Sequence, residues 1–313
     1  MISSWAGKRV LVTGGAGFVG RAVVAALYSR GVTAADVVVP RSRDCDLRIA
    51  EHAYRAARRC DVVFHLAAPT GNIEFSRAHP ASQYRDCSRI NVNVFEAARQ
   101  AGVKRLVSLG NLLAYSPSVP APFVEDRVRE GEVAPDHAGI ALAKRQLLDL
   151  APLYHREFGL DAVTVLGANA YGPHDHFAGA QAHVIPSLIT KCLRDEDLQV
   201  WGDGTAVRDF LYVDDLADGM LLAAERLPAA SVINIASGSG VAIGELVRII
   251  AGLCGFKRRI LFDASRSGGD MRRVASTERA RALLGFAPRV PLEDGLRRTI
   301  EWYRQSPVSA AAP

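Results

Sequence analysis

The sequence lacks an apolar run of the roughly 20 residues that a membrane-spanning helix needs. Residues 1–8 lack the apolar segment of a secretion signal, so we expect a cytoplasmic protein with no membrane partner. Cysteines are few and scattered, with no Cys-x-x-Cys pair and no Cys/His ligand spacing, so we expect reduced thiols and no metal site. The five cysteines are Cys45, Cys60, Cys87, Cys192 and Cys254.

The sequence also lacks a block of like charge. Its formal net charge is +5, but lysines and arginines are interspersed with acids along the whole chain. This pattern is typical of a solvated surface or of a site for small anionic ligands, and it argues against a nucleic-acid partner.

Apolar residues are abundant, at 49% of 313 residues, which is ample for a large core. Apolar runs typical of strands alternate with helical segments, which predicts an α/β fold: a Rossmann-type doubly wound parallel sheet with a smaller C-terminal substrate-binding domain. We expect a dinucleotide-binding domain at 1–170 plus about 210–236, and a nucleotide-sugar-binding domain at about 171–209 plus 237–313. The predicted early elements are strands at Val10–Val12, Val37–Val39, Val62–Ala68 and Leu106–Leu109, and helices at Arg21–Leu27 and Ile90–Ala101.

A glycine-rich turn follows the first predicted strand and leads into the first helix through Phe18 and Val19. Gly14 or Gly15 permits a tight turn, Gly17 lets a pyrophosphate approach the backbone, and Gly20 allows close packing of helix on strand. The exposed N–H groups of the helix N-terminus would bind the phosphates. The context of strand, turn and helix therefore favours dinucleotide binding over a purely structural turn.

The end of the second predicted strand indicates which dinucleotide. An NAD site is expected to carry an acid here, but the chain has Arg41, Ser42 and Arg43. Guanidiniums suit a 2′-phosphate, which favours NADP while leaving NAD possible. The alternative is that both arginines only face water.

Several longer motifs accompany this turn. They are Asn169–Asp175, His183–Pro186, Val200–Gly204, Arg208–Ala217, Leu261–Ser265 and the pair Arg272 and Arg273. Taken together they resemble the extended short-chain dehydrogenase/reductase superfamily, also known as the NAD-dependent epimerase/dehydratase family, and within it most closely the GDP-L-fucose synthase family. The resemblance implies an epimerase-reductase of a GDP-keto-sugar, with Asp46 and Leu47 beside the adenine and Asn169 below the nicotinamide. The small residues that end the strand predicted at Val62–Ala68 would let the cofactor lie across Ala67.

The catalytic positions depart from the pattern that this resemblance implies. The superfamily uses a Tyr-x-x-x-Lys motif with a nearby Ser or Thr. Here Lys144 matches the lysine, Ile140 stands at the tyrosine position and Asn111 at the hydroxyl position. Of the epimerising Cys and His, Leu113 replaces the first and His183 matches the second. Loss of a general acid costs about 10² to 10⁴-fold in rate, so epimerisation is favoured over reduction.

Two residues near these positions are candidates for a replacement acid, His137 and Tyr115, although both also fit loop or packing roles. Lys144 could be a surface lysine instead of a ribose ligand. His183 could be a structural histidine at a helix start instead of an acid or base.

Substrate residues follow from the same resemblance. Multiple cations from separate segments suit a nucleotide-diphosphate sugar, with GDP preferred on the resemblance alone. Trp201 fits either an aromatic contact or core packing. The family also implies a homodimer formed through Val92–Ala101 and Ala141–Phe158. The implied substrate-binding residues are Asn169, His183, Lys191, Trp201, Arg208 and Arg273.

The sequence therefore supports two hypotheses. The first is an NADP-binding nucleotide-sugar epimerase/reductase with altered acid/base residues, in which Lys144, His183 and Asn111 are catalytic. The second is a catalytically silent nucleotide-sugar or NADP-binding protein, or a partner subunit of an active homologue.

Overall fold

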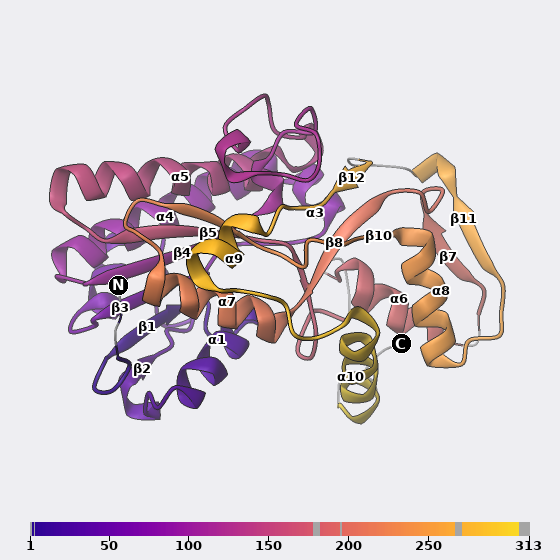
Figure 1. The fold of residues 1–313 in the computed structure, drawn as a ribbon, viewed down its shortest axis with the longest axis horizontal. Coiled ribbons are helices and arrows are strands. Elements are labelled where there is room, and N and C mark those ends of the chain that lie inside the picture. Colours follow the sequence, from indigo (N-terminus) through magenta and orange to yellow (C-terminus); the bar gives the residue numbers. More distant parts are fainter. Residues whose placement is uncertain (1, 3, 178–181, 195, 267–270, 307–313) are drawn as a thin grey trace.

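The computed structural model describes residues 2, 4–177, 182–194, 196–266 and 271–306 (Figure 1). In these ranges the largest sheet is parallel, with six strands in the order β2-β1-β3-β4-β5-β9. Its strands β1 and β3 are buried throughout, as expected for a parallel sheet that is covered on both faces. The strands are β1 (Val10–Thr13), β2 (Val37–Val38), β3 (Val62–His65), β4 (Arg105–Asn111), β5 (Ala162–Gly167) and β9 (Val232–Ile235).

Helices cover both faces of this sheet, with α4 and α5 above it and α1 and α7 below it in Figure 1. Side chains of one strand alternate between the two layers: Val10 and Val12 join the core with Val23 of α1, whereas Leu11 joins the core with Val94 of α4. The doubly wound Rossmann-type fold is thereby confirmed. These helices are α1 (Phe18–Ser29), α2 (Ala50–Ala57), α4 (Pro80–Gln100), α5 (Ala138–Phe158) and α7 (Val213–Arg226).

The strand order reverses at β1, which pairs with β2 on one side and with β3 on the other. The connections leaving the carboxyl ends of β1 and β3 therefore diverge, and such a point is where doubly wound folds bind their ligands.

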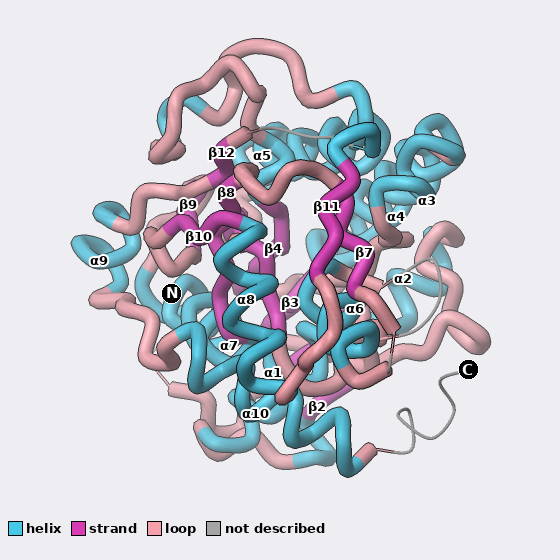
Figure 2. Tube along the Cα trace, turned by 90° about the vertical axis from the view of Figure 1, so that its right-hand side faces the viewer, coloured by secondary structure: helices cyan, strands magenta, loops and turns pink. Residues whose placement is uncertain are grey.

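Two smaller sheets and a third core lie beside the large sheet, toward the viewer in Figure 2. In one, β8 (Val207–Tyr212) pairs with β6 (Asn169–Tyr171), β10 (Gly240–Ala242) and β12 (Arg272–Arg273). In the other, β7 (Leu198–Trp201) pairs with β11 (Ile260–Asp263). The remaining helices are α3 (Ile73–Ala78), α6 (Val184–Cys192), α8 (Ile243–Cys254), α9 (Glu278–Leu284) and α10 (Leu292–Gln305).

After β8 and before β10 the chain returns to the large sheet, because α7 packs on α1 and β9 pairs with β5. The division into two domains at the stated boundaries stays a prediction. Among the described helices, none is both long enough and apolar enough to span a bilayer.

Every early predicted element differs from the structure by at least one residue at an end, and β3, α1 and α4 differ by three or more. Strand β3 stops at His65 instead of Ala68, because the N–H groups of Leu66 and Ala67 turn toward the Thr13 hydroxyl. Helix α4 begins at Pro80 instead of Ile90, with the proline in the first turn, where its missing N–H is tolerated.

Candidate functional site

The glycine turn has the geometry that the sequence predicts. Gly14 has a φ of +70°, so it is the residue that makes the left-handed turn, and a Cβ on it would lie 3.1 Å from the Ala67 nitrogen. A Cβ on Gly20 would lie 2.1 Å from the Gly14 oxygen, which is why α1 can start directly beside β1. A Cβ on Gly17 would meet only the Gly14 oxygen, at 3.2 Å. The backbone at Gly17 is therefore open on the side of the turn.

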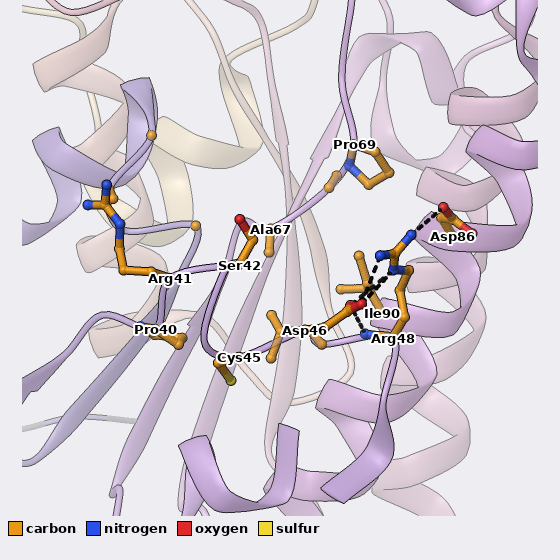
Figure 3. A pocket seen from close by; sticks show the side chains of 15 residues that line it. Pro40, Arg41, Ser42, Cys45, Asp46, Arg48, Ala67, Pro69, Asp86 and Ile90 are labelled. Carbon is orange, nitrogen blue, oxygen red and sulfur yellow. Dashed lines mark hydrogen bonds and ion pairs between the residues drawn. The ribbon is translucent and has the colours of Figure 1, made fainter. Parts of the chain in front are cut away.

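A cavity of about 510 Å³ opens from this turn across the carboxyl ends of β1 and β3 (Figure 3). It is lined by six of the predicted cofactor residues: Gly14, Gly17, Arg41, Asp46, Leu47 and Ala67. The structure places the other predicted cofactor residues elsewhere. Phe18, Val19 and Gly20 form the first turn of α1, and Lys144 and Asn169 lie on α5 and β6.

The two predicted phosphate-binding arginines have different surroundings. Arg41 lines the cavity, whereas the side chain of Arg43 is 82% exposed and pairs with Asp44 at 3.0 Å. Arg48, which no sequence pattern indicated, also lines the cavity. Arg48 binds Asp46 at 2.8 Å and Asp86 at 3.0 Å (Figure 3), and its hydrogen bonds to Asp46 lower the pKa of that carboxyl to about 2.

Lys144 is buried, so it is not a surface lysine. It projects from α5, and its Nζ donates to the carbonyl of Leu109 at 2.7 Å, at the carboxyl end of β4. Burial lowers the pKa of Lys144, although the Cys87 thiol opposes the shift. The ammonium therefore lies beside the same end of the sheet as the cavity.

The surroundings of Ile140 are apolar. Ile140 is 4% exposed and packs with Cys87 and Ala143, against Ala68 and Leu113. Burial raises the pKa of the Cys87 thiol to about 11. None of these five side chains carries a hydroxyl, carboxyl or imidazole, so none of them is a proton donor that is effective near neutral pH.

Asn111 ends β4 next to this cluster. Its side-chain Oδ1 accepts the N–H of Leu113 at 3.2 Å and caps the short 3₁₀ turn η2 (Leu112–Ala114). The amide oxygen thus holds the turn, and the Nδ2 group is the part of this side chain that can donate to a ligand.

The two candidate replacement acids differ. Tyr115 is fully buried, stacks on Phe123 and donates its hydroxyl to Asn234 at 2.9 Å, which makes it a packing residue. Burial raises its pKa further. His137 is half-buried and immediately precedes α5, as its N-cap residue. Burial and the charges of Arg273 and, to a smaller extent, Arg77 and Arg208 lower the pKa of His137, although the charge of Asp136 opposes the shift.

Arg208 and Arg273 are neighbours on paired strands, β8 and β12. Arg273 is 5% exposed and donates to the carbonyl of Leu112 at 2.6 Å, in the turn that Asn111 caps. Burial and the charge of Arg208 lower the pKa of Arg273 to about 10. Two guanidiniums at this proximity favour an anion between or beside them.

His183 forms a pair with Asp175, a residue that the sequence analysis did not assign to the site. The His183 Nδ1 lies 2.9 Å from the Asp175 Oδ1, which also accepts the N–H of His176 at 2.7 Å. The carboxylate only accepts, so Nδ1 carries the proton and Nε2 is the basic nitrogen. Burial lowers the pKa of His183, but the hydrogen bond and charge of Asp175 outweigh it and raise the pKa overall. The His183 side chain is 43% exposed.

The remaining predicted substrate residues occupy the smaller sheets and α6. Lys191 donates to the Gln199 carbonyl at 2.9 Å and joins α6 to β7, and Asn169 donates to the Asp209 carbonyl at 2.9 Å. Trp201 is 43% exposed at the end of β7, so it is not a core residue.

Residues 10–236 match the model of the NAD dependent epimerase/dehydratase family. The chain belongs to this family. The matched segment runs from β1 to the end of β9 and includes Lys144, His183 and Arg208, whereas Arg273 follows it. The family resemblance stated from the sequence is therefore confirmed.

Relatives cover nearly the whole chain. GDP-L-fucose synthase of Escherichia coli (strain K12) is 34% identical over 96% of this chain and 97% of its own length. Probable GDP-L-fucose synthase 1 of Oryza sativa subsp. japonica is 32% identical over 97% and 94%.

Solved structures agree with the fold. A GDP-L-fucose synthetase from Naegleria fowleri bound to NADP superposes with a TM-score of 0.87 at 25% identity, over 97% of this chain and 96% of that one. The UDP-glucose 4-epimerase of Thermotoga maritima superposes with a TM-score of 0.85 at 28% identity, over 95% and 98%.

Proposed function

We propose that this protein is an NADP-binding epimerase/reductase of a GDP-keto-sugar, in which epimerisation is retained more fully than reduction. The names of the relatives, GDP-L-fucose synthases at 32–34% identity over nearly the whole chain, support the substrate class. The observation that carries the proposal is the His183–Asp175 pair, an acid/base group with an exposed imidazole, in a chain whose residue 140 is an isoleucine in an apolar cluster.

The cavity supports a dinucleotide. Gly17 leaves its backbone open to a pyrophosphate, and Arg41 at the end of β2 is the guanidinium available to a 2′-phosphate. We assign Asp46 and Leu47 to the adenine side, Ala67 to the face under the cofactor, and Lys144 to the ribose. NADP accepts or donates a hydride when it is bound, and NAD stays the alternative.

The paired arginines support a diphosphate. Arg273 is buried and Arg208 half-buried, and an anion would stabilise these two neighbouring positive charges by charge-assisted hydrogen bonds. We assign the diphosphate to this pair, with Lys191 as a further cation, and the sugar or base to Trp201 and Asn169. Guanine itself is inferred from the relatives' names.

In the proposed reaction the His183 Nε2 removes a proton from the carbon beside the sugar ketone, while the Asn111 Nδ2 donates to a sugar oxygen. Asp175 stabilises the imidazolium that forms. A proton from water then reaches the opposite face of the enolate, which inverts the configuration and labels the carbon in deuterated solvent, and the proton on His183 passes to the solvent. His137 stays the candidate for a replacement acid, but its lowered pKa leaves the imidazole mostly neutral near pH 7 and therefore a weak proton donor.

Reduction by hydride transfer has no comparable proton donor at residue 140. Ile140 cannot donate a proton to the alcohol oxygen that reduction of a ketone creates, so we expect reduction to be slower by about 10² to 10⁴-fold than with an effective acid. The same apolar cluster favours the second candidate function, a catalytically silent binding protein or a partner subunit of an active homologue.

Exposed apolar side chains on α4 and α5 support a homodimer. These two helices pack side by side, and large apolar residues on both remain exposed, which is typical of a surface that binds a partner. We propose a homodimer in the cytoplasm. The exposed residues are Tyr84 and Val92 on α4 and Leu142, Leu153 and Phe158 on α5.

Incubation with GDP-4-keto-6-deoxymannose in deuterated water, with and without NADPH, tests the proposal. We expect deuterium beside the ketone by NMR and mass spectrometry, and its loss in His183→Gln. The matched control is His155→Gln, which changes an exposed imidazole on α5 that lies 3.2 Å from the Leu160 carbonyl. Absence of exchange with tight binding of both nucleotides would support the silent protein instead.

A further inference from the structure

A chain of hydrogen bonds crosses the interior beneath the cofactor cavity. The Thr13 hydroxyl lies 2.9 Å from the His65 Nδ1, and the His65 Nε2 lies 3.0 Å from the Asn91 Oδ1. These three side chains, from β1, β3 and α4, are at most 3% exposed. Water therefore does not compete for their hydrogen bonds, and each donor needs its acceptor within the protein.

The direction of every hydrogen bond in this chain can be worked out. The Thr13 oxygen accepts the N–H of Leu66 at 3.1 Å and of Ala67 at 3.2 Å, which uses both lone pairs. Its own proton must then go to His65 Nδ1, so Nδ1 is the acceptor. The proton of a neutral His65 is consequently on Nε2 and is donated to the Asn91 oxygen.

The Asn91 amide continues the chain to α5. With its oxygen used as the acceptor, its Nδ2 donates to the carbonyl of Ala143 at 2.9 Å and to the Gln146 Oε1 at 3.0 Å. Ala143 immediately precedes Lys144. At the other end, Ala67 lines the cofactor cavity, and its nitrogen is the atom nearest to a Cβ built on Gly14.

We propose that His65, held as the neutral Nε2–H tautomer, is a positioning residue that couples the glycine turn of the cofactor cavity to the helix that carries Lys144. It acts through Thr13 on the backbone of Ala67, and through Asn91 on the turn of α5 at Ala143. The inference rests on the proposed function, because both ends of the chain are proposed cofactor contacts.

The orientation of His65 has a reason in this arrangement. An imidazole can accept on one edge and donate on the other, and this chain requires that combination. Protonation would place a second N–H against the Thr13 hydroxyl proton. Burial and the nearby Lys144 ammonium both oppose that protonation, although the Asn91 hydrogen bond favours it, and the net pKa of His65 is about 4.

Substitution tests the coupling. His65→Leu removes both polar edges at similar volume, whereas His65→Gln keeps an acceptor and a donor. We expect His65→Leu to raise the Kd for NADPH, measured by fluorescence titration, by about tenfold or more, and His65→Gln to recover part of that loss. His155→Leu is the matched control and should leave the Kd unchanged. Unchanged affinity in a folded His65→Leu protein would overturn the inference.

A spectroscopic measurement covers the case in which His65→Leu fails to fold. Two-bond ¹H–¹⁵N correlation spectra of the wild-type protein with labelled histidine should contain one ring in the Nε2–H tautomer that stays neutral from pH 7.5 to pH 5. Thr13→Val should perturb that ring, and NADPH should shift it in the wild type. An Nδ1–H tautomer for this ring would overturn the inference.

The two proposals fail separately. Wild-type protein that binds neither NADPH nor NADP would refute the proposed function. Wild-type binding that is indifferent to a folded His65→Leu change would refute only the role of His65.

Discussion

Gly20→Ala should disrupt the packing of α1 against β1. The added Cβ would lie 2.1 Å from the Gly14 oxygen and 2.5 Å from the Gly15 Cα, both rigid backbone atoms. Carbon atoms need about 3.5 Å, so α1 must move away by roughly 1 Å. We expect a loss of about 3 kcal/mol in the free energy of unfolding, at the upper end of the usual cost of overpacking. Urea denaturation followed by circular dichroism measures this loss.

Gly17→Ala, in the same turn, should give the opposite pattern. Its Cβ would meet only the Gly14 oxygen at 3.2 Å, and Gly17 has φ of −80° and ψ of −177°, which alanine adopts readily. We expect the free energy of unfolding to change by less than about 1 kcal/mol, whereas the methyl group should weaken NADPH binding by at least about tenfold because it occupies the pyrophosphate approach.

Gly252→Ala is the control for both changes. Nothing lies within 4 Å of a Cβ at this position in α8, so alanine should stabilise the helix by up to about 1 kcal/mol and leave NADPH binding unchanged. The reasoning would be refuted if Gly20→Ala were as stable as the wild type, or if Gly17→Ala bound NADPH normally.

Three further predictions concern charged and titratable groups. His65 has a pKa of about 4 in the folded protein against about 6.5 when unfolded. The contribution of the neutral imidazole to the free energy of unfolding is therefore fully present above pH 6.5, and about 3 kcal/mol of it is lost as the pH drops toward 4. Urea denaturation between pH 7 and pH 4.5 should show this slope, and His65→Gln should reduce it; equal slopes would contradict the assignment. Arg273→Met should weaken GDP binding by about 10 to 100-fold in calorimetry while leaving NADPH binding unchanged, with the exposed Arg304→Met as control. Equal GDP affinities in the two variants would refute the assignment of the diphosphate to Arg208 and Arg273. Asp175→Asn removes the charge that raises the pKa of His183, so the acidic limb of the deuterium-exchange rate should move to lower pH; an unmoved limb would exclude the pair from the proton transfer.

Local patterns in the sequence predict the large sheet and the glycine turn, because strand burial and turn geometry depend on neighbouring residues. Gly14, Gly17 and Gly20 each have the steric surroundings that their spacing implies. The end of β3 could not be predicted in this way, since it depends on the hydroxyl of Thr13, which is 52 residues distant from His65 in the chain.

The roles of several other site residues depend on contacts with side chains that are distant in the sequence, so local patterns could not predict them. Tyr115 is a reasonable acid by position, and only its contact with Asn234, 119 residues later, identifies it as a packing residue. Arg48 is adjacent to a predicted cofactor residue, but its place in the cavity depends on Asp86 of α4. Asp175 ends the motif Asn169–Asp175, but only the fold brings its carboxylate to the His183 imidazole.

The central claim is that epimerisation is retained more fully than reduction. The ratio of the rate of deuterium incorporation to the rate of NADPH oxidation tests it most directly. In one sample of wild-type protein with GDP-4-keto-6-deoxymannose and NADPH in deuterated water, deuterium incorporation and NADPH oxidation are followed together. We predict that incorporation is faster by about 10²-fold or more, and that Ile140→Tyr, which restores an acid four residues before Lys144, narrows the ratio. NADPH oxidation by the wild type as fast as incorporation, or faster, would contradict the account.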